Sequence, residues 1–330
     1  MSNNSSKQLM ESGYIFADRQ LGPTQLKLYR ENIDNFKSIF TPHLTLDPVG
    51  KFRGESFVLC EVDCKQLEVS GLAEITRDKV LLDELNRGVD IHLENAALWK
   101  KKPTSQISDP VRRQAKTMTF QLQYGSSSKG MAQTLNIPMS EAADFIQAFL
   151  IKYTGVAKYF ENLSFLASSS ATNIEPSDKI YLLDPKNAGG TNPFGTLYPV
   201  GIYESYGGQW KPSLTQMKNY PIQGFATGDL IPYIRCLLQN FLDEIDAQDQ
   251  GIYYLTTVHD SFVFQFPESS LVTFLSCVEH TFRNLKNNFF NTHGQALLAP
   301  YDYGIEIGFN WSEMVKYDRK QVQQLTGIGP

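Results

Sequence analysis

The pattern of apolar and polar positions in the first half of the chain predicts a strand followed by helices. Residues 57–63 (FVLCEVD) form a short, apolar, β-favouring run that ends at an acid. The segment 66–75 (QLEVSGLAEI) follows with apolar residues at helical spacing. A further helix is expected over 112–124, because the Asp-Pro pair at 109–110 is a start signal and Gly125 a stop signal.

The middle of the chain alternates between helical patterns and turn chemistry. A helix is expected over about 140–153, and another over about 223–245, which Pro232 must kink or interrupt. Between about 167 and 212, clusters of Gly, Pro, Ser and Asn separate short aromatic runs. These clusters predict a long irregular excursion on the surface.

A hairpin is expected in the last third of the chain. Two β-rich runs, YYLTTV (253–258) and SFVFQF (261–266), flank the pair His259 and Asp260. GIEIGF (304–309) has the pattern of a further strand. Strands and helices together predict an α+β protein.

Composition excludes several classes of protein. At 330 residues, 42% hydrophobic and 20% charged, the chain can bury a substantial core, which excludes an intrinsically disordered or collagen-like protein. No apolar run is long enough to cross a membrane, and the first residues (MSNNSSKQLM) lack the apolar region of a secretory signal. We therefore expect a soluble, cytoplasmic protein without a membrane partner. The cysteines favour reduced thiols and give no support for a zinc site: Cys60, Cys64, Cys236, Cys277.

The charged residues leave room for a local basic groove. The net charge of −5 argues against binding nucleic acid by bulk electrostatics alone. However, cations recur every fourth residue in the helix expected over 112–124, where Arg112 and Lys116 precede Phe120 and Tyr124. One helix face therefore presents two cations and then two rings, an order that suits a nucleoside triphosphate. An amphipathic helix with core aromatics is the alternative for each residue taken singly.

Three motifs in this sequence resemble those of the DNA polymerase I family (family A). RRQAKTMTFQLQYG (112–125) is similar to motif B, the nucleotide-binding helix of the fingers. VDCKQLE (62–68), followed by GVDIH (88–92), resembles motif A, and VHDS (258–261) resembles motif C. NYPIQG (219–224) is similar to the segment before motif C. The motifs occur in the family's order and at similar spacing.

The resemblance implies the right-hand polymerase fold. We expect a palm of antiparallel sheet and helices, made from about 9–72 and 216–330, with mainly helical fingers inserted at about 73–215 and a mobile tail at 1–8. The implied reaction is template-directed attack of a primer 3′-hydroxyl on the α-phosphate of a dNTP, with release of pyrophosphate. Two Mg²⁺ ions, or Mn²⁺ in their place, are the implied cofactors.

The resemblance also assigns the site residues. Asp63 and Asp260 are the expected metal ligands, with the backbone carbonyl of Cys64 as a further oxygen, and Lys116 is positioned to protonate the leaving group. Glu68 and Tyr124 together are expected to close the space near the 2′ position of the incoming sugar. The nucleotide-binding set is Gln66, Glu68, His92, Arg112, Lys116, Phe120, Tyr124. The set expected to contact primer–template DNA is Arg113, Gly125, Asn219, Gln223, His259.

For several of these residues an ordinary structural role is the alternative. The acid of a lone His-Asp pair usually serves only to form a turn, and this is the alternative for Asp260. A buried histidine is the alternative for His92, and a solvated helix carboxylate for Glu68. For the amides Asn219 and Gln223, the alternative is ordinary surface polarity.

The sequence departs from the family pattern at two positions. Ser261 stands where motif C usually ends in Glu, and the related single-subunit RNA polymerases often have HDS, which keeps an RNA polymerase fragment open. Glu68 and Phe120 favour DNA synthesis over that alternative. Ser70 occupies a position where motif A commonly has a basic residue. A non-catalytic DNA-binding replication subunit is a second alternative, opposed by the intact acids and cations.

The chain is short relative to the family pattern. Only 62 residues precede Asp63, and these show neither an exonuclease-like cluster of acids nor a long basic helix pair typical of a thumb. We therefore expect thumb and exonuclease domains to be absent from this chain and supplied by a separate protein subunit, as in a split, phage-like polymerase.

Overall fold

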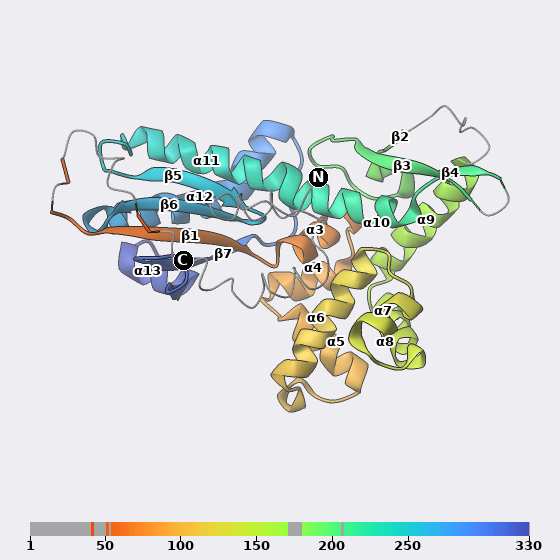
Figure 1. Ribbon diagram of the computed structural model, residues 1–330. Coiled ribbons are helices and arrows are strands. Elements are labelled where there is room, and N and C mark those ends of the chain that lie inside the picture. The colour runs from red at the N-terminus through yellow and green to blue at the C-terminus, as the bar shows by residue number, and fades with distance from the viewer. Residues whose placement is uncertain (1–40, 43–50, 53, 171–179, 206–207, 330) are drawn as a thin grey trace, which may run out of the picture.

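A computed structural model describes residues 41–42, 51–52, 54–170, 180–205 and 208–329 (Figure 1). The tail expected at 1–8 lies outside the described residues. Within them, no helix is both long and apolar enough to cross a membrane. The model contains an antiparallel sheet with helices packed against it, as the α+β prediction requires.

A five-stranded antiparallel sheet forms one end of the molecule, in the order β5-β6-β1-β7-β8. Its strands are β1 (Phe57–Lys65), β5 (Tyr253–Val258), β6 (Ser261–Pro267), β7 (Asp302–Gly308) and β8 (Val315–Asp318). The expected strand at 57–63 and the hairpin around His259 and Asp260 are confirmed as β1 and as β5–β6. The central strand β1 pairs with β6 and β7, so its residues have strand neighbours on both sides.

The two faces of this sheet differ in chemistry. Side chains alternate along a strand, and directly opposed residues of paired strands share a face. Phe264 and Phe266 of β6 contact Phe274 of α12 (Leu271–His293), with ring centroids 4.8 and 4.7 Å apart. α12 packs in turn against α11 (Ile231–Glu244), and both helices lie along the sheet in Figure 1. The other face carries the acids of β1.

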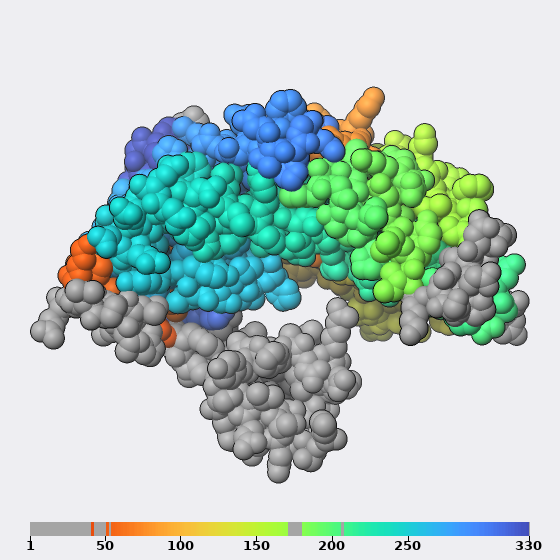
Figure 2. All heavy atoms as spheres, turned by 90° about the horizontal axis from the view of Figure 1, so that it is seen from above, coloured from red at the N-terminus to blue at the C-terminus, as the bar shows by residue number. Residues whose placement is uncertain are grey.

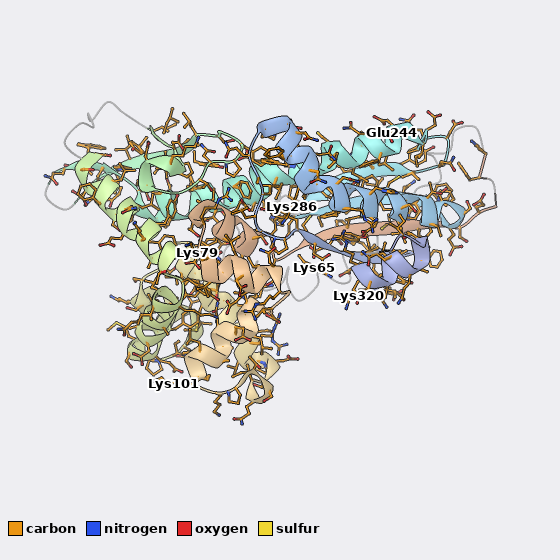
Figure 3. The ribbon with its side chains drawn as sticks, turned by 180° about the vertical axis from the view of Figure 1, so that it is seen from behind. Lys65, Lys79, Lys101, Glu244, Lys286 and Lys320 are labelled. Atoms are coloured by element: carbon orange, nitrogen blue, oxygen red, sulfur yellow. The ribbon has the colours of Figure 1, made fainter. Side chains whose placement is uncertain are left out.

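Helices follow β1 without a long loop. These are α3 (Leu67–Thr76), α4 (Lys79–Asn86), α5 (Ile91–Lys100), the 3₁₀ turn η2 (Thr104–Gln106), α6 (Asp109–Gln123), α7 (Ser128–Leu135), α8 (Met139–Lys152) and α9 (Thr154–Ser170). α5 packs against α6 and α8. Figure 3 shows Lys101, after α5, far from Lys320 of α13 (Arg319–Thr326) at the sheet end. The helices expected over 112–124 and 140–153 are thus confirmed as α6 and α8.

The segment expected to be irregular contains a second sheet. The strand β2 (Ile180–Leu183) precedes the 3₁₀ turn η3 (Pro185–Ala188), and β3 (Tyr198–Glu204) and β4 (Trp210–Pro212) follow it. The three strands form a sheet in the order β2-β3-β4. Each strand is short, but Leu183 and Val200 are fully buried, and this burial compensates for the weak local pattern. Figure 2 shows this green region adjoining the blue-green atoms of the neighbouring helices.

The helix expected over 223–245 begins earlier and is interrupted before Pro232. It comprises α10 (Leu214–Gln223), a π-helical segment η4 (Gly224–Leu230) and α11. Pro232 lies in the first turn of α11. A proline has no N–H to donate and its ring crowds the carbonyl four residues back, so the wider π turn before it relieves both conflicts.

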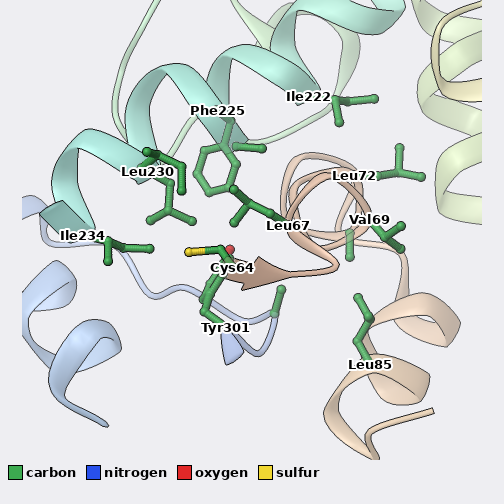
Figure 4. Close-up of a cluster of buried hydrophobic side chains, with 14 of the residues drawn as sticks. Cys64, Leu67, Val69, Leu72, Leu85, Ile222, Phe225, Leu230, Ile234 and Tyr301 are labelled. Carbon is green, nitrogen blue, oxygen red and sulfur yellow. The ribbon is translucent and has the colours of Figure 1, made fainter. Parts of the chain in front are cut away.

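The core packs the end of β1 against the continuous helical segment formed by α10, η4 and α11. Leu67 of α3 and Cys64 lie beside Phe225, Leu230 and neighbouring apolar side chains in Figure 4. Gly71 permits this approach, because a Cβ there would lie 3.3 Å from the Cβ of Ala226. The start of α3 is therefore fixed between the sheet and the π segment, immediately after the acid at the end of β1.

Candidate active site

The sheet brings together the two acids expected to bind metal. Asp63 lies near the end of β1, directly opposite Ser261 in the register of β6. The Cys64 N–H donates to the Asp260 carbonyl over 3.0 Å, so the hairpin turn is tied to the same end of β1. His259 adopts φ 54°, the left-handed conformation that this tight two-residue turn requires. Two carboxylates from distant parts of the sequence thus meet at one sheet end.

The environment of Asp63 disfavours its charged form relative to an exposed aspartate. Burial and the neighbouring carboxylate of Asp260, followed by Glu61 and Glu306, raise the pKa of Asp63 to about 6, and Lys316 opposes the shift. Asp63 is partly buried, while Lys316 is exposed and paired with Glu306. Negative charge therefore accumulates here without a buried compensating cation among the residues that the structure describes.

The donor set fits Mg²⁺ better than a soft metal. Burial first, then the charges of Asp63 and Asp260, raises the pKa of the Cys64 thiol well above its usual value, and its side chain belongs to the apolar cluster of Figure 4. Cys64 could therefore offer only its carbonyl oxygen. In the described ranges no three His, Cys, Asp or Glu side chains form a ready-made metal cage. Mg²⁺ commonly takes one or two carboxylates and leaves its other positions to water and phosphate oxygens.

The helix α6 carries the predicted cations and rings. Arg112 is held by Asp90, with Nε 2.6 Å from Oδ2. Lys116 is exposed, and its Nζ lies 5.5 Å from the centroid of the Phe120 ring. The rings of Phe120 and Tyr124 stack with centroids 6.4 Å apart. The helical spacing thus puts all four predicted residues on one side of α6, in the expected order.

His92 lies close to this face but is buried, at 4% exposure. Its ring packs edge-on against Phe120 at 5.4 Å. Burial, and secondarily the charge of Lys116, lowers the pKa of His92 to about 4. Its Nδ1 has no hydrogen-bond partner among the described residues. The histidine is therefore neutral at pH 7 in the protein without bound nucleotide.

Glu68 and Tyr124 meet as expected. The Tyr124 hydroxyl donates to the Glu68 carboxylate, 2.8 Å from Oε2 and 3.0 Å from Oε1. Burial, followed by the charge of Glu68, raises the pKa of Tyr124, and a side-chain hydrogen bond with Gln223 opposes this shift. The contact joins α3, which follows the Asp63 strand, to the end of α6. Gln66, between β1 and α3 in the sequence, is exposed with φ 51° and makes no side-chain cap to α3.

The residues expected to contact DNA occupy three different places. Arg113 is exposed on α6, next to Arg112 but on another side of the helix. Gly125 ends that helix with φ +73°, and a Cβ there would lie 3.2 Å from the Cα of Thr215. Asn219 and Gln223 are half-buried on α10, and His259 is exposed at the hairpin turn. Gln223 lies within hydrogen-bond reach of Tyr124, and the DNA-contact roles of all five residues stay predictions.

Two acids next to the site were given no role by the sequence. Asp90 caps the N-terminus of α5 and pairs with Arg112. Glu61 accepts hydrogen bonds from Ser261 Oγ at 2.6 Å and from Trp311 Nε1 at 2.7 Å. Glu61 stands two residues before Asp63 in a strand, and that spacing alone places both on one face. For Asp90 the only sequence signal was its place in GVDIH.

Comparisons with known proteins agree with this geometry. The sequence model of DNA polymerase family A matches residues 51–313, most of the chain. DNA polymerase I of Pseudomonas aeruginosa is 27% identical over 262 residues, which are 78% of this chain and 25% of that protein. DNA polymerase I of Caldicellulosiruptor bescii is also 27% identical, over 78% of this chain and 27% of its own length. The chain thus spans about a quarter of these relatives.

A shorter match is closer, and a solved structure shares the fold. DNA polymerase I of Geobacillus stearothermophilus is 36% identical over 107 residues, which are 32% of this chain and 12% of that protein. The POL domain of Pol1 from M. smegmatis, solved in complex with DNA primer-template and dNTP, has a TM-score of 0.58 and 19% identity, covering 84% of this chain and 42% of that one. At this identity the likeness concerns the fold alone.

Proposed function

Because the chain belongs to DNA polymerase family A, we propose that it is a template-directed DNA polymerase subunit that extends a primer 3′ end with dNTPs and releases pyrophosphate. The observation that carries the proposal is the meeting of Asp63 and Asp260 at one sheet end, because these acids come from separate motifs and share no local reason to converge. The Glu68–Tyr124 contact links this end to the cationic helix α6.

In the proposed phosphoryl transfer, the acids bind metal ions and the cations of α6 bind the triphosphate. Two Mg²⁺ ions, or Mn²⁺ in their place, would neutralise charge on the attacking and leaving oxygens when bound. Asp63 and Asp260 would hold the cations, with the Cys64 carbonyl as a further oxygen. Arg112 and Lys116 bind the triphosphate, and Lys116, which is exposed and carries no ion pair in the described part of the chain, can donate a proton to the leaving pyrophosphate.

The choice of sugar falls to Glu68 and Tyr124. Their hydrogen bond holds the carboxylate and the ring edge together, so a 2′-hydroxyl would have to displace a fixed group. This contact favours deoxyribonucleotides over ribonucleotides, and so favours a DNA polymerase over the RNA polymerase alternative. Gln66, His92 and Phe120 complete the proposed nucleotide site, with His92 as a neutral donor. The primer–template contacts are assigned to Arg113, Gly125, Asn219, Gln223 and His259.

Primer extension by Asp63→Ala and Asp260→Ala variants tests the proposal. Each variant is expected to lose all but a few per cent of extension with Mg²⁺, while circular dichroism and DNA binding stay near wild type, because a partly exposed carboxylate is removed and not a core contact. Asp83→Ala, an exposed acid on α4, is the control for loss of an acid and should extend normally.

The outcomes separate the alternatives. Near-normal extension by either variant would overturn the assignment of the metal ligands. A wild-type protein that prefers rNTPs is an RNA polymerase of the same superfamily, and one that binds DNA without any extension is a non-catalytic subunit. Completion by a separate polypeptide with thumb and exonuclease functions stays a prediction, which extension at physiological salt with and without proteins encoded beside this chain would test.

A further inference from the structure

Asp90 uses its two carboxylate oxygens for different partners. Oδ1 accepts the backbone N–H groups of His92 and Leu93, both over 3.1 Å, and so caps the N-terminus of α5. Oδ2 accepts Arg112 Nε over 2.6 Å and forms an ion pair with it. The carboxylate therefore joins the start of α5 to the start of α6, the two helices that carry His92 and the cations.

The side of Arg112 that Asp90 engages decides what the contact does. A guanidinium presents five N–H donors in a rigid plane, and its terminal fork matches the paired oxygens of phosphate. Asp90 hydrogen-bonds only Nε, at the base of that fork. No protein group among the described residues accepts a hydrogen bond from the fork of Arg112. A carboxylate that blocked phosphate binding would cover the fork, whereas this one holds the plane by its edge.

We propose that Asp90 is a positioning residue for the incoming nucleotide, which orients the guanidinium of Arg112 so that its terminal fork faces the triphosphate. The role rests on the proposed function, since it needs a triphosphate at α6. A long arginine side chain loses considerable rotamer freedom when it binds, and one already fixed at Nε loses less. The cap adds a second effect, because the same carboxylate holds the backbone of His92 in the first turn of α5.

The contact also predicts the sign of the effect. If Asp90 orients Arg112, its removal weakens triphosphate binding. If Asp90 competes with phosphate, its removal strengthens binding. Both side chains are about one-third exposed, at 35% for Arg112 and 36% for Asp90, so water can replace the lost contact and the fold should survive. Asp90→Asn keeps an oxygen for the α5 cap and removes the charge that holds Nε.

Nucleotide binding by Asp90→Asn tests the role directly. The full chain is bound to a primer that ends in a dideoxynucleotide, and dATP is titrated calorimetrically with Mg²⁺ opposite template T, so no chemistry occurs. We expect the dATP Kd to rise about three- to ten-fold, in keeping with the modest energy of a half-exposed ion pair. In single-nucleotide extension the KM should rise similarly while kcat changes little. Asp318→Asn, the exposed N-cap of α13, is the matched control and should bind dATP as the wild type does.

A double variant separates positioning from general damage. In an Arg112→Ala background, Asp90→Asn should change the dATP Kd by less than two-fold, because the Arg112 contact has gone and the asparagine keeps the α5 cap. An equal loss in both backgrounds, or tighter binding by Asp90→Asn, would overturn the inference. Asp90→Ser, which keeps a cap donor-acceptor but no charge, repeats the test if the asparagine variant is unstable. Absence of extension by the wild type would instead refute the proposed function.

Discussion

Replacing His92 by glutamine should flatten the dependence of stability on pH. His92 is buried, and burial together with Lys116 and Arg112 of α6 lowers its pKa from the usual 6.5 to about 4, against the opposing charge of Asp90. The unfolded chain therefore binds a proton at a higher pH than the folded protein does. It follows that the contribution of His92 to the free energy of unfolding is fully present above pH 6.5. This contribution is lost as the pH drops towards 4.

The size of the effect follows from the shift. Each pKa unit corresponds to about 1.4 kcal/mol, so the complete loss attributable to His92 is on the order of 3 kcal/mol. About 2 kcal/mol of this should be lost between about pH 7 and about pH 5. His92→Gln cannot titrate, so its free energy of unfolding should fall by about that much less than the wild type's over the same range.

Urea denaturation at the two pH values measures this difference, because the carboxylates shared by both proteins cancel in the comparison. The transition must be a single step with the same urea dependence in both proteins for the difference to be read as free energy. His280→Gln, at an exposed position of α12, controls for the loss of a histidine. Parallel pH profiles for wild type and His92→Gln would show that the buried ring does not resist protonation and would refute the reasoning.

Three further substitutions test separate parts of the structure. Glu68→Ala should raise the ratio of rNTP to dNTP incorporation at least several-fold, by opening the sugar site; an unchanged ratio in single-nucleotide extension would remove Glu68 from that role. Ser261→Glu should lower both the melting temperature and primer extension, because the new carboxylate would lie against that of Glu61. Glu61→Gln in the same chain should restore part of both, and a double variant whose losses equal the sum of the single losses would contradict this. Glu74→Ala should cost about 3–5 kcal/mol in urea denaturation, since the buried carboxylate accepts N–H groups of Leu298 and other donors; a loss under about 1 kcal/mol would contradict this.

The parts of the fold that sequence predicted are those with a local cause. The hairpin follows from two alternating runs about a two-residue turn, and its register then places Ser261 opposite Asp63. The α6 face follows from spacing within one helix. The second sheet was missed because β2 and β3 each bury few side chains, such as Leu183 and Val200, and the packing of β3 on α10 and of β4 on α9 leaves no local pattern in the sequence.

The candidate site divides along the same line. Asp63, Asp260 and the Glu68–Tyr124 pair were predictable because motifs with known partners contain them. Asp90 also lies in such a motif, but its partner Arg112 is 22 residues away on another helix. No sequence pattern in either segment predicts that the two side chains pair. A carboxylate at a helix start reads in sequence as a cap, and Asp90 is one. Only the packing of α5 on α6 shows that its second oxygen is free to hold a cation. A capping acid that precedes a cationic helix should therefore be examined for both roles wherever the two helices pack together.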